Sequence, residues 1–449
     1  MRRLFQLATP VMAAQLGTMA MSTVDTLMVA RVGVAELAAA AIANAWIYGV
    51  LLACQGMIHG VAPIVTQAHG ARRGDLAGLA LQHALVVALV LSVPAGLALA
   101  STGPVLLALG QDPELAELAH AYTRVQVPGV PFLLLFLALR QYLQGRELVR
   151  PAMWVVGLAN GFNLLANWAL IFGHLGLPAL GVVGAGVATT LTRAFMLLAL
   201  VAMVWRLGLH RGAWVPLGRR ALERAGLARV VAFGSPVAIQ MALEVWAFSA
   251  STLIVGRLGA ADLSGHSIVM NLASLSFMMP LGLSQGAVTR VGNLIGAGRR
   301  QAAQRAAWVA LACGAGLMSS WAVLFVVARL GLPRLYTAEP AVVAAAASVL
   351  PVAAAFQIFD GTQVVGAGIL RGMGRTRPAA WFNLVGWWVL ALPLAAWLTL
   401  ETGAGLQGVW WALCFGLAVV ATAMVLWIRA RGPAHEPLPV AGGPTMGHR

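Results

Sequence analysis

Long apolar runs recur along the whole of this 449-residue sequence and limit what it can fold into. Each run is about 20 residues long, the length an α-helix needs to cross the ~30 Å hydrocarbon core of a bilayer. The runs are unbroken, whereas the strands of a membrane β-barrel would alternate apolar and polar residues over ~10 positions. The sequence therefore predicts an all-α integral membrane protein. The twelve expected transmembrane helices cover residues 7–30, 37–68, 79–101, 117–143, 151–173, 183–206, 231–255, 264–292, 303–327, 341–370, 378–400 and 407–429.

The distribution of basic residues predicts how the chain is oriented. The net charge of +15 could indicate a nucleic-acid partner, but only 10% of the residues are charged and 60% are hydrophobic. The chain has no lysine, and most of its arginines fall in every second connecting segment, beginning with Arg2 and Arg3. This bias marks the cytoplasmic side of a membrane protein. We therefore expect a multi-pass protein of the bacterial inner (plasma) membrane with both termini in the cytoplasm, and no nucleic-acid partner.

The sequence repeats itself once. Pro10 and Pro236 are 226 residues apart, and in the same register "TLMVARVG" (26–33) matches "TLIVGRLG" (252–259). One residue further apart, "RPAMW" (150–154) matches "RPAAW" (377–381). A repeat of six helices keeps both halves in the same orientation, with a pseudo-twofold axis along the membrane normal. We predict an N-lobe of residues 1–206, a cytoplasmic linker of residues 207–230, a C-lobe of residues 231–429 and a disordered cytoplasmic tail of residues 430–449.

This organisation is typical of secondary transporters, in which the substrate binds between the two halves. Because a Walker A loop needs a lysine to hold phosphate, a chain without lysine cannot itself bind a nucleotide in that way. No nucleotide and no cofactor are expected. Transport would then draw on a gradient of H⁺ or Na⁺, and the protein would not be an enzyme.

Three acidic residues lie inside apolar runs: Asp25, Glu244 and Asp360. An ionised carboxylate near the bilayer centre costs at least ~2.5 kcal/mol, so each side chain must face the protein interior or water. The repeat argues against a purely structural role, because these acids align with Ser251, Thr18 and Leu133 and are absent from the matching half. We predict that all three couple transport to cations or protons.

Competition at such a carboxylate is sufficient for antiport. Burial favours the protonated form, and a bound Na⁺ or organic cation favours the charged form. A second polar stripe is formed by Asn160, Asn163 and Asn167, which share one face of a helix. These amides either hydrogen-bond to neighbouring helices or line a cavity. We place them with the predicted lining of the substrate cavity, and we add Gln240 and Trp246, which lie on either side of Glu244.

Four stretches together resemble the MATE (multidrug and toxic compound extrusion) transporters, and most closely their NorM-like branch. These are "VDTLMVARVG", "NWALIFGHLGLPALGVVGAGVAT", "SPVAIQMALEVWAF" and "FDGTQVVGAGILRGMGRTRPA". The resemblance covers nearly the whole chain. It implies a MATE/MOP-type fold of twelve helices in two lobes, an outward-opening cleft, and export of cationic, often aromatic drugs against Na⁺ or H⁺.

The resemblance also assigns roles to residues. It places Asp25, Glu244 and Asp360 on the acidic positions of the branch. Pro10 falls on a helix-bending position of the family, and its repeat partner Pro236 is grouped with it as a conformational residue.

The helix that carries Asp360 departs from the pattern of some sodium-coupled relatives. These relatives have a tyrosine one turn before the aspartate, where this chain has Phe356. Phenylalanine has no oxygen for a hard cation, so H⁺ is favoured over Na⁺. Na⁺ at Glu244 and Asp360 stays an alternative, with carbonyl or water oxygens completing the site. Phe356 is placed with the predicted cavity lining.

The expected function is export of cationic amphipathic compounds by a monomer whose partners are these small molecules and the lipid bilayer. Two alternatives remain. One is a lipid-linked oligosaccharide flippase of the same superfamily, for which a cation-rich cavity would be expected. The other is a channel or a non-transporting membrane receptor.

Overall fold

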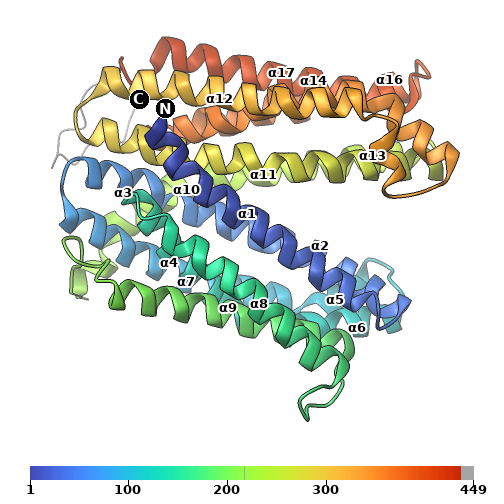
Figure 1. The fold of residues 1–449 in the computed structure, drawn as a ribbon, viewed down its shortest axis with the longest axis horizontal. Helices are drawn as coiled ribbons and strands as arrows, with labels where there is room; N and C mark the ends of the chain where they lie inside the picture. The colour runs from blue at the N-terminus through green and yellow to red at the C-terminus, as the bar shows by residue number, and fades with distance from the viewer. Residues whose placement is uncertain (217, 436–449) are drawn as a thin grey trace.

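A computed structural model of the protein describes residues 1–216 and 218–435. Every regular element in these ranges is helical. In Figure 1 the helices gather into two groups that meet near the two termini and separate at the opposite end. We call the groups the N-bundle (α1 to α9) and the C-bundle (α10 to α17). We call the end at which the termini lie the closed end, and the other the open end.

The helices of the N-bundle are α1 (Arg2–Val29), α2 (Val34–His59), α3 (Val61–Gly70), α4 (Gly74–Ala100), α5 (Thr102–Ala108), α6 (Pro113–Arg124), α7 (Gly129–Gly145), α8 (Arg150–Phe172) and α9 (Gly181–Arg206). A 3₁₀ turn, η1 (Arg219–Leu222), follows. The C-bundle contains α10 (Arg224–Val255), α11 (Ala260–Gly296), α12 (Arg300–Val327), α13 (Gly331–Arg334), α14 (Pro340–Gly372), α15 (Thr376–Asn383), the π-helical segment η2 (Leu384–Ala391), α16 (Leu392–Leu400) and α17 (Gly405–Arg431).

The described residues contain ten helices that are long and apolar enough to span a membrane, or eleven if α6 and α7 form one bent span. The all-α membrane class is therefore confirmed. The expected span at 7–30 is a continuous helix, α1, but it is not among the ten or eleven. Its hydropathy is lowered by polar residues such as Gln15, Thr18 and Asp25, so its passage through the membrane stays a prediction.

Several expected spans are interrupted. The span at 37–68 consists of α2 and α3, which meet at Gly60. The span at 117–143 consists of α6 and α7, bent by 51°. Pro128 lies at the start of α7, where its missing N–H removes no helical hydrogen bond. The span at 378–400 contains the π-helical segment. The predicted tail at 430–449 lies mostly outside the described residues, since α17 ends at Arg431 and residues 436–449 are not described.

The two bundles have separate hydrophobic cores. One continuous cluster of buried side chains runs from Ala14 to Val230 in the N-bundle. Two others lie in the C-bundle, and the second of them also contains Leu4 and Ala8 from the beginning of α1. The first two turns of α1 are thus packed against the C-bundle, while the rest of this helix belongs to the N-bundle.

Close helix crossings join the bundles in matching pairs. A Cβ atom at Gly56 of α2 would lie 2.4 Å from the Cα of Ala238 on α10. A Cβ atom at Gly282 of α11 would lie 2.4 Å from the Cγ of Met12 on α1. The two glycines are 226 residues apart, and so are their two partners. The sequence repeat therefore appears in the structure as two equivalent contacts, each of which leaves no space for a side chain at the glycine.

Candidate functional site

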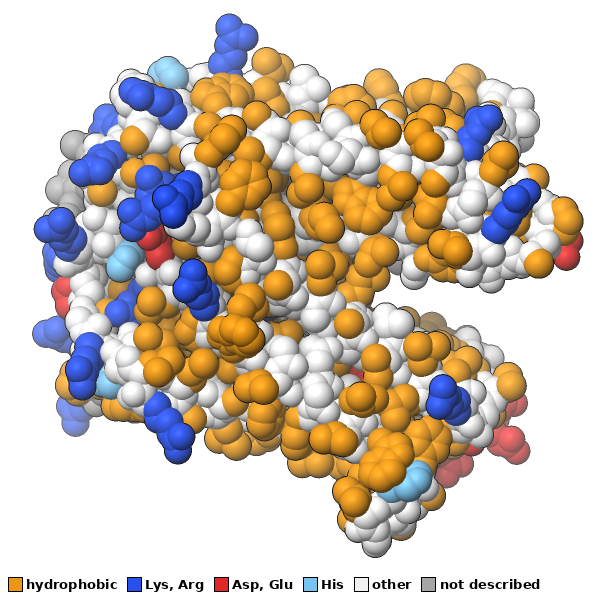
Figure 2. Space-filling model, in the orientation of Figure 1, with side chains coloured by type: hydrophobic (Ala, Val, Ile, Leu, Met, Phe, Trp, Pro, Cys, Tyr) orange, Lys and Arg blue, Asp and Glu red, His pale blue; other side chains and the backbone are white. Residues whose placement is uncertain are grey.

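A cleft separates the bundles at the open end. Figure 2 shows it as a deep notch, and blue arginine side chains crowd the opposite face of the molecule. A cavity of about 460 Å³ lies in the cleft wall, within the range that holds drug-sized ligands. Its wall combines hydroxyl, amide, aromatic and thioether groups. The lining residues are Tyr48, Val245, Phe248, Ser249, Thr252, His266, Ser267, Met270, Asn271 and Ser274.

The C-bundle brings two of the predicted acids together. Glu244 lies in the middle of α10, and Asp360 lies on α14. The two carboxyl groups are close enough for their charges to interact. Glu244 is half-buried and Asp360 is 4% exposed. Among the described residues, neither acid forms an ion pair with a basic side chain. This pair is therefore an uncompensated acidic site, which can hold protons or attract a cation.

An amide chain holds this pair in place. Gln363, one turn after Asp360, hydrogen-bonds to Glu244 and donates through Nε2 to Oδ1 of Asn383 at 3.2 Å. The same Oδ1 atom accepts the indole N–H of Trp387 at 3.0 Å. Trp387 lies in the π-helical segment, and such segments are frequent at functional sites. The helix irregularity thus places an indole donor where it fixes the amides behind the acids.

Two glutamine oxygens near the acids have no hydrogen-bond partner among the described residues. They are Oε1 of Gln357 and Oε1 of Gln363, and both side chains are fully buried. Gln357 donates instead through Nε2 to Ser276 at 2.7 Å. Buried polar atoms without a partner are rare and call for an explanation. Water or a cation at the acid pair would satisfy both oxygens.

The N-bundle holds the third predicted acid. Asp25 on α1 accepts a hydrogen bond from the Nδ2 atom of Asn167, which also donates to Oδ1 of Asn163 at 3.1 Å. Asn163 in turn donates to Thr192 on α9 at 3.4 Å. Asn163 and Asn167 are buried, and Asp25 is half-buried. The structure therefore brings together Asp25 and two of the three predicted amides.

Arg193 distinguishes the site in the N-bundle from the site in the C-bundle. It lies on α9, next to Thr192, and its charge acts on Asp25 although the two groups form no ion pair. Its Nη1 atom is buried without a hydrogen-bond partner. The single carboxylate of the N-bundle thus has a compensating positive charge nearby.

The remaining predicted residues are more scattered. Asn160 donates to the carbonyl of Val156 in its own helix, and Gln240 is buried. Trp246 is 57% exposed but does not line the cavity. Phe356 is 2% exposed and packs against Phe248, Trp387 and Trp410, with ring centroids 5.8–6.4 Å away. In this structure it lies behind the cleft wall, so its lining role stays a prediction.

Pro10 and Pro236, the two predicted conformational residues, lie inside the continuous helices α1 and α10. Both prolines are near the close crossings between the bundles. Their conformational role stays a prediction.

Several polar residues of the site were not predicted from the sequence. Gln363 follows Asp360 by three residues in "FDGTQ", so helical spacing could have identified it. Tyr48 and His266 come from other helices, and the sequence gives no sign that they meet α10. His266 is fully buried, with Nε2 3.2 Å from the hydroxyl of Thr252 and Nδ1 without a partner.

Known proteins share this arrangement of helices. The crystal structure of the eukaryotic MATE transporter AtDTX14 superposes with a TM-score of 0.88 over 96% of both chains, at 22% identity. A MOP superfamily transporter from Pyrococcus furiosus superposes with a TM-score of 0.86, also over 96% of both chains, at 20% identity. At such low identity, these likenesses define the fold as that of a MATE-type membrane transporter.

Sequence relatives define the family. The MatE family model matches residues 10–169 and again 236–397, and the two matches begin at the repeated prolines. The chain is 36% identical to a multidrug resistance protein NorM of Burkholderia vietnamiensis over 429 residues, covering 93% of this chain and 91% of the relative. It is 34% identical to a multidrug resistance protein MdtK of Yersinia pestis, covering 95% of both. The chain belongs to the MatE family of multidrug efflux transporters and is not an enzyme. The predicted resemblance is confirmed.

Proposed function

We propose that this protein is an antiporter that exports cationic amphipathic compounds, many of them aromatic, in exchange for H⁺ or Na⁺. Its twelve helices would form two lobes, residues 1–206 and 231–429, joined by the linker 207–230. The lobes would rock about the bound substrate to give alternating access. The observation that carries the proposal is the pair of Glu244 and Asp360, two carboxylates without a basic partner among the described residues.

Orientation in the membrane follows from charge. The arginine-rich closed end would face the cytoplasm with both termini, and the open end would face outward from the bacterial inner membrane. The structure then corresponds to an outward-open state. In this state the substrate can leave, and an external ion can reach the half-buried Glu244.

The cavity supports a cationic and aromatic substrate. Phe248 and Tyr48 offer ring faces, and Met270 offers an adaptable apolar surface. The charge of Glu244 acts on the phenol of Tyr48, so the acid and the cavity belong to one electrostatic environment. No arginine lines the described cavity. This argues against the flippase alternative, which would need positive charge to hold a pyrophosphate.

Exchange would proceed by competition for Glu244 and Asp360. A cationic substrate from the cytoplasm would bind while the acids are charged, and ion entry from outside would neutralise them and release it. Protons need no further ligand. For Na⁺, the free oxygens of Gln357 and Gln363 could replace the oxygen that Phe356 lacks.

The test is efflux of a fluorescent cationic dye from proteoliposomes under a pH gradient and a sodium gradient, applied separately. Movement against the dye gradient under either condition supports the antiporter and identifies the ion. Downhill leakage alone would favour a channel. Absence of dye movement under both gradients would refute the proposal.

A further inference from the structure

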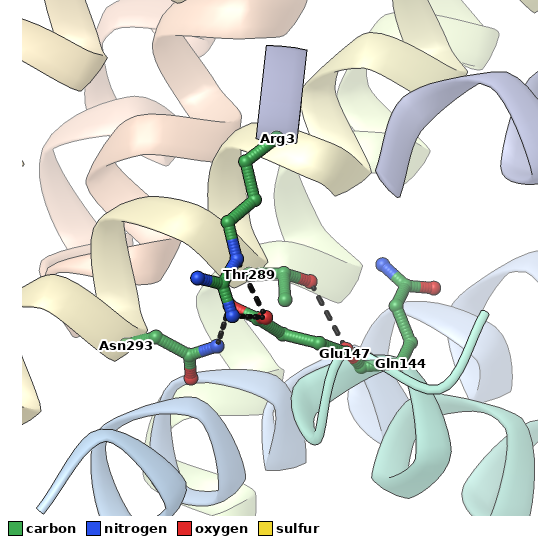
Figure 3. A network of polar contacts seen from close by, with 5 residues as sticks. All are labelled: Arg3, Gln144, Glu147, Thr289 and Asn293. Carbon is green, nitrogen blue, oxygen red and sulfur yellow. Dashed lines mark hydrogen bonds and ion pairs between the residues drawn. The ribbon is translucent and has the colours of Figure 1, made fainter. Parts of the chain in front are cut away.

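A polar network joins the bundles at the closed end, far from the cleft (Figure 3). Glu147 lies in the turn between α7 and α8 of the N-bundle. Its Oε2 atom accepts hydrogen bonds from Nη2 and Nε of Arg3, at 2.8 and 3.2 Å, and its Oε1 atom accepts one from Nδ2 of Asn293, at 3.0 Å. Asn293 belongs to α11 of the C-bundle. One carboxylate thus ties together the start of α1, the α7–α8 turn and the opposite bundle.

The surrounding contacts form a closed seam between the bundles. Gln144 of α7 donates to the Oε1 atom of Gln285 on α11 at 3.0 Å, and Thr289 donates back to the carbonyl of Gln144 at 3.3 Å. A Cβ atom at Gly70 would lie 2.0 Å from the carbonyl oxygen of Asn293. The backbones of α3 and α11 therefore touch here. Any access to the cleft from the closed end requires this seam to part.

The backbone of Glu147 is unusual. Its φ is +63°, in the left-handed region that residues other than glycine rarely adopt. The repeat that aligns 150–154 with 377–381 places Gly374 at the equivalent position, with φ +78°. The other half thus forms this turn with the residue that suits it. An unfavourable backbone conformation that persists at one residue points to a role for its side chain.

The equivalent contact in the other half contains no carboxylate. Gln67 is 226 residues before Asn293, and its Nε2 atom donates across the seam to the carbonyl of Gly372 at 3.1 Å. Both halves therefore use an amide to hold the opposite bundle. Only at Asn293 does the amide meet a charged acceptor, and hydrogen bonds to charged groups are roughly twice as strong as neutral ones.

Glu147 remains charged under cytoplasmic conditions. Burial raises its pKa, but the hydrogen bonds from Asn293 and Arg3 and the charges of Arg3 and Arg290 lower it further, so that the net result is a lowered pKa. Its contribution to the closed seam is therefore complete at neutral pH and is lost only as the pH falls through that lowered value. The side chain is 17% exposed, so water screens these contacts only in part.

We propose that Glu147 is a positioning residue for the transport cycle, a latch that holds the cytoplasmic seam closed in the outward-open state. The inference rests on the proposed alternating access. The contact with Asn293 must break each time the seam opens, whereas Arg3 can keep its hydrogen bonds to Glu147. The strength of the latch would set the balance between outward-open and inward-open molecules.

The test measures that balance by cysteine labelling of the purified protein in detergent. In a background with Cys54, Cys313 and Cys414 replaced by alanine, Thr66→Cys reports on the seam, because Thr66 is fully buried there. Ser249→Cys, in a separate variant, reports on the cleft. We expect Glu147→Gln to raise the rate of maleimide labelling at position 66 about tenfold, the ratio that ~1.4 kcal/mol gives, and to lower the rate at position 249.

Two further variants complete the test. Glu147→Gly should shift labelling in the same way without a loss of thermal stability, because glycine suits φ +63°. The matched control is Asp75→Asn, which removes an acid that pairs with Arg73 at 3.0 Å within one bundle, and it should change neither rate.

Unchanged labelling in both Glu147 variants would overturn the latch, and so would faster labelling at both cysteines, which indicates general loosening. Labelling needs no substrate. A wild-type protein that exports no dye would therefore refute the proposed function while leaving the labelling result to decide on the latch.

Discussion

The two bundles share one helical plan but differ in the charge of their polar sites. In the N-bundle, Asp25 is held by Asn167 and lies within reach of the positive charge of Arg193. In the C-bundle, Glu244 and Asp360 lie close together, and among the described residues they form no ion pair. The N-bundle site is nearly neutral when its groups are ionised, whereas the C-bundle site carries up to two negative charges.

This difference shows how a duplicated scaffold can acquire different sites. The packing contacts at Gly56 and Gly282 are equivalent in the two halves because both bundles must approach each other equally closely. The charged groups are under no such constraint, and the repeat partners of the three acids are not acidic. We therefore expect the C-bundle to carry most of the coupling and the N-bundle to modify it.

The largest effect should come from removing the charge of the C-bundle site. Glu244→Gln keeps the shape of a protonated acid but cannot be recharged, so ion-driven dye export should fall by about 100-fold or more, as expected when a contact worth several kcal/mol is lost in a poorly solvated site. Dye efflux from proteoliposomes measures this. Glu401→Gln, at an exposed helix end, is the control and should export normally. Normal export by Glu244→Gln would remove the basis of the proposal.

A smaller effect is expected in the N-bundle. Asp25→Asn should reduce export about three- to tenfold, because ~1 kcal/mol corresponds to roughly fivefold and Arg193 already offsets much of this charge. The same efflux assay, run beside Asp360→Asn, measures the ratio. If Asp25→Asn abolished export as completely as Asp360→Asn, the two sites would be equal and the comparison would fail.

Arg193→Gln sharpens the same comparison. Without the arginine, Asp25 becomes an uncompensated acid like those of the C-bundle. In a Glu244→Gln background, this change should increase the binding affinity for a cationic dye about threefold, equivalent to ~0.65 kcal/mol, measured by fluorescence titration. An unchanged affinity would mean that charge balance does not explain the difference between the bundles.

The amides that support the acids should affect stability more evenly. Gln363→Leu and Asn167→Leu each remove a hydrogen bond to a carboxylate, and each should lower the free energy of unfolding by about 1–3 kcal/mol. Thermal unfolding in detergent at neutral pH compares them. Gln407→Leu, whose amide donates to a backbone carbonyl at an exposed position, is the control and should change stability little. A marked loss at only one of the two sites would show that the supports, and not only the charges, have diverged.

The smallest effect concerns the choice of ion. Phe356→Tyr adds a hydroxyl one turn before Asp360, in an aromatic cluster with little free space. We expect sodium-driven efflux to rise about twofold relative to proton-driven efflux, because a hydroxyl oxygen is a suitable ligand for a hard cation. Phe248→Tyr, at another position in the same cluster, controls for repacking. Equal changes in both variants would show that the oxygen does not act at the acid pair.

The sequence determined a large part of this protein. Apolar run length predicts membrane helices because a helix of fixed rise must match the thickness of the bilayer. The repeat predicts two matching halves, and the equivalent glycine contacts and the double family match agree with it. The rarity of acids in apolar segments singled out Asp25, Glu244 and Asp360, because a charge in hydrocarbon is too costly without a role. The grouping of Asn163 and Asn167 follows from helical spacing.

Only the tertiary structure decided which helices meet, because contacts between bundles depend on the angle and depth of helix crossings, and no local pattern records these. Tyr48 and His266 joined the cleft in this way. Glu147 is the sharpest case. In the sequence it is an acid in a connecting segment, but the folded chain brings it to Asn293, 146 positions away, in a backbone conformation that its repeat partner assigns to glycine. Its role depends on the closure of two bundles against each other, which neither half encodes alone.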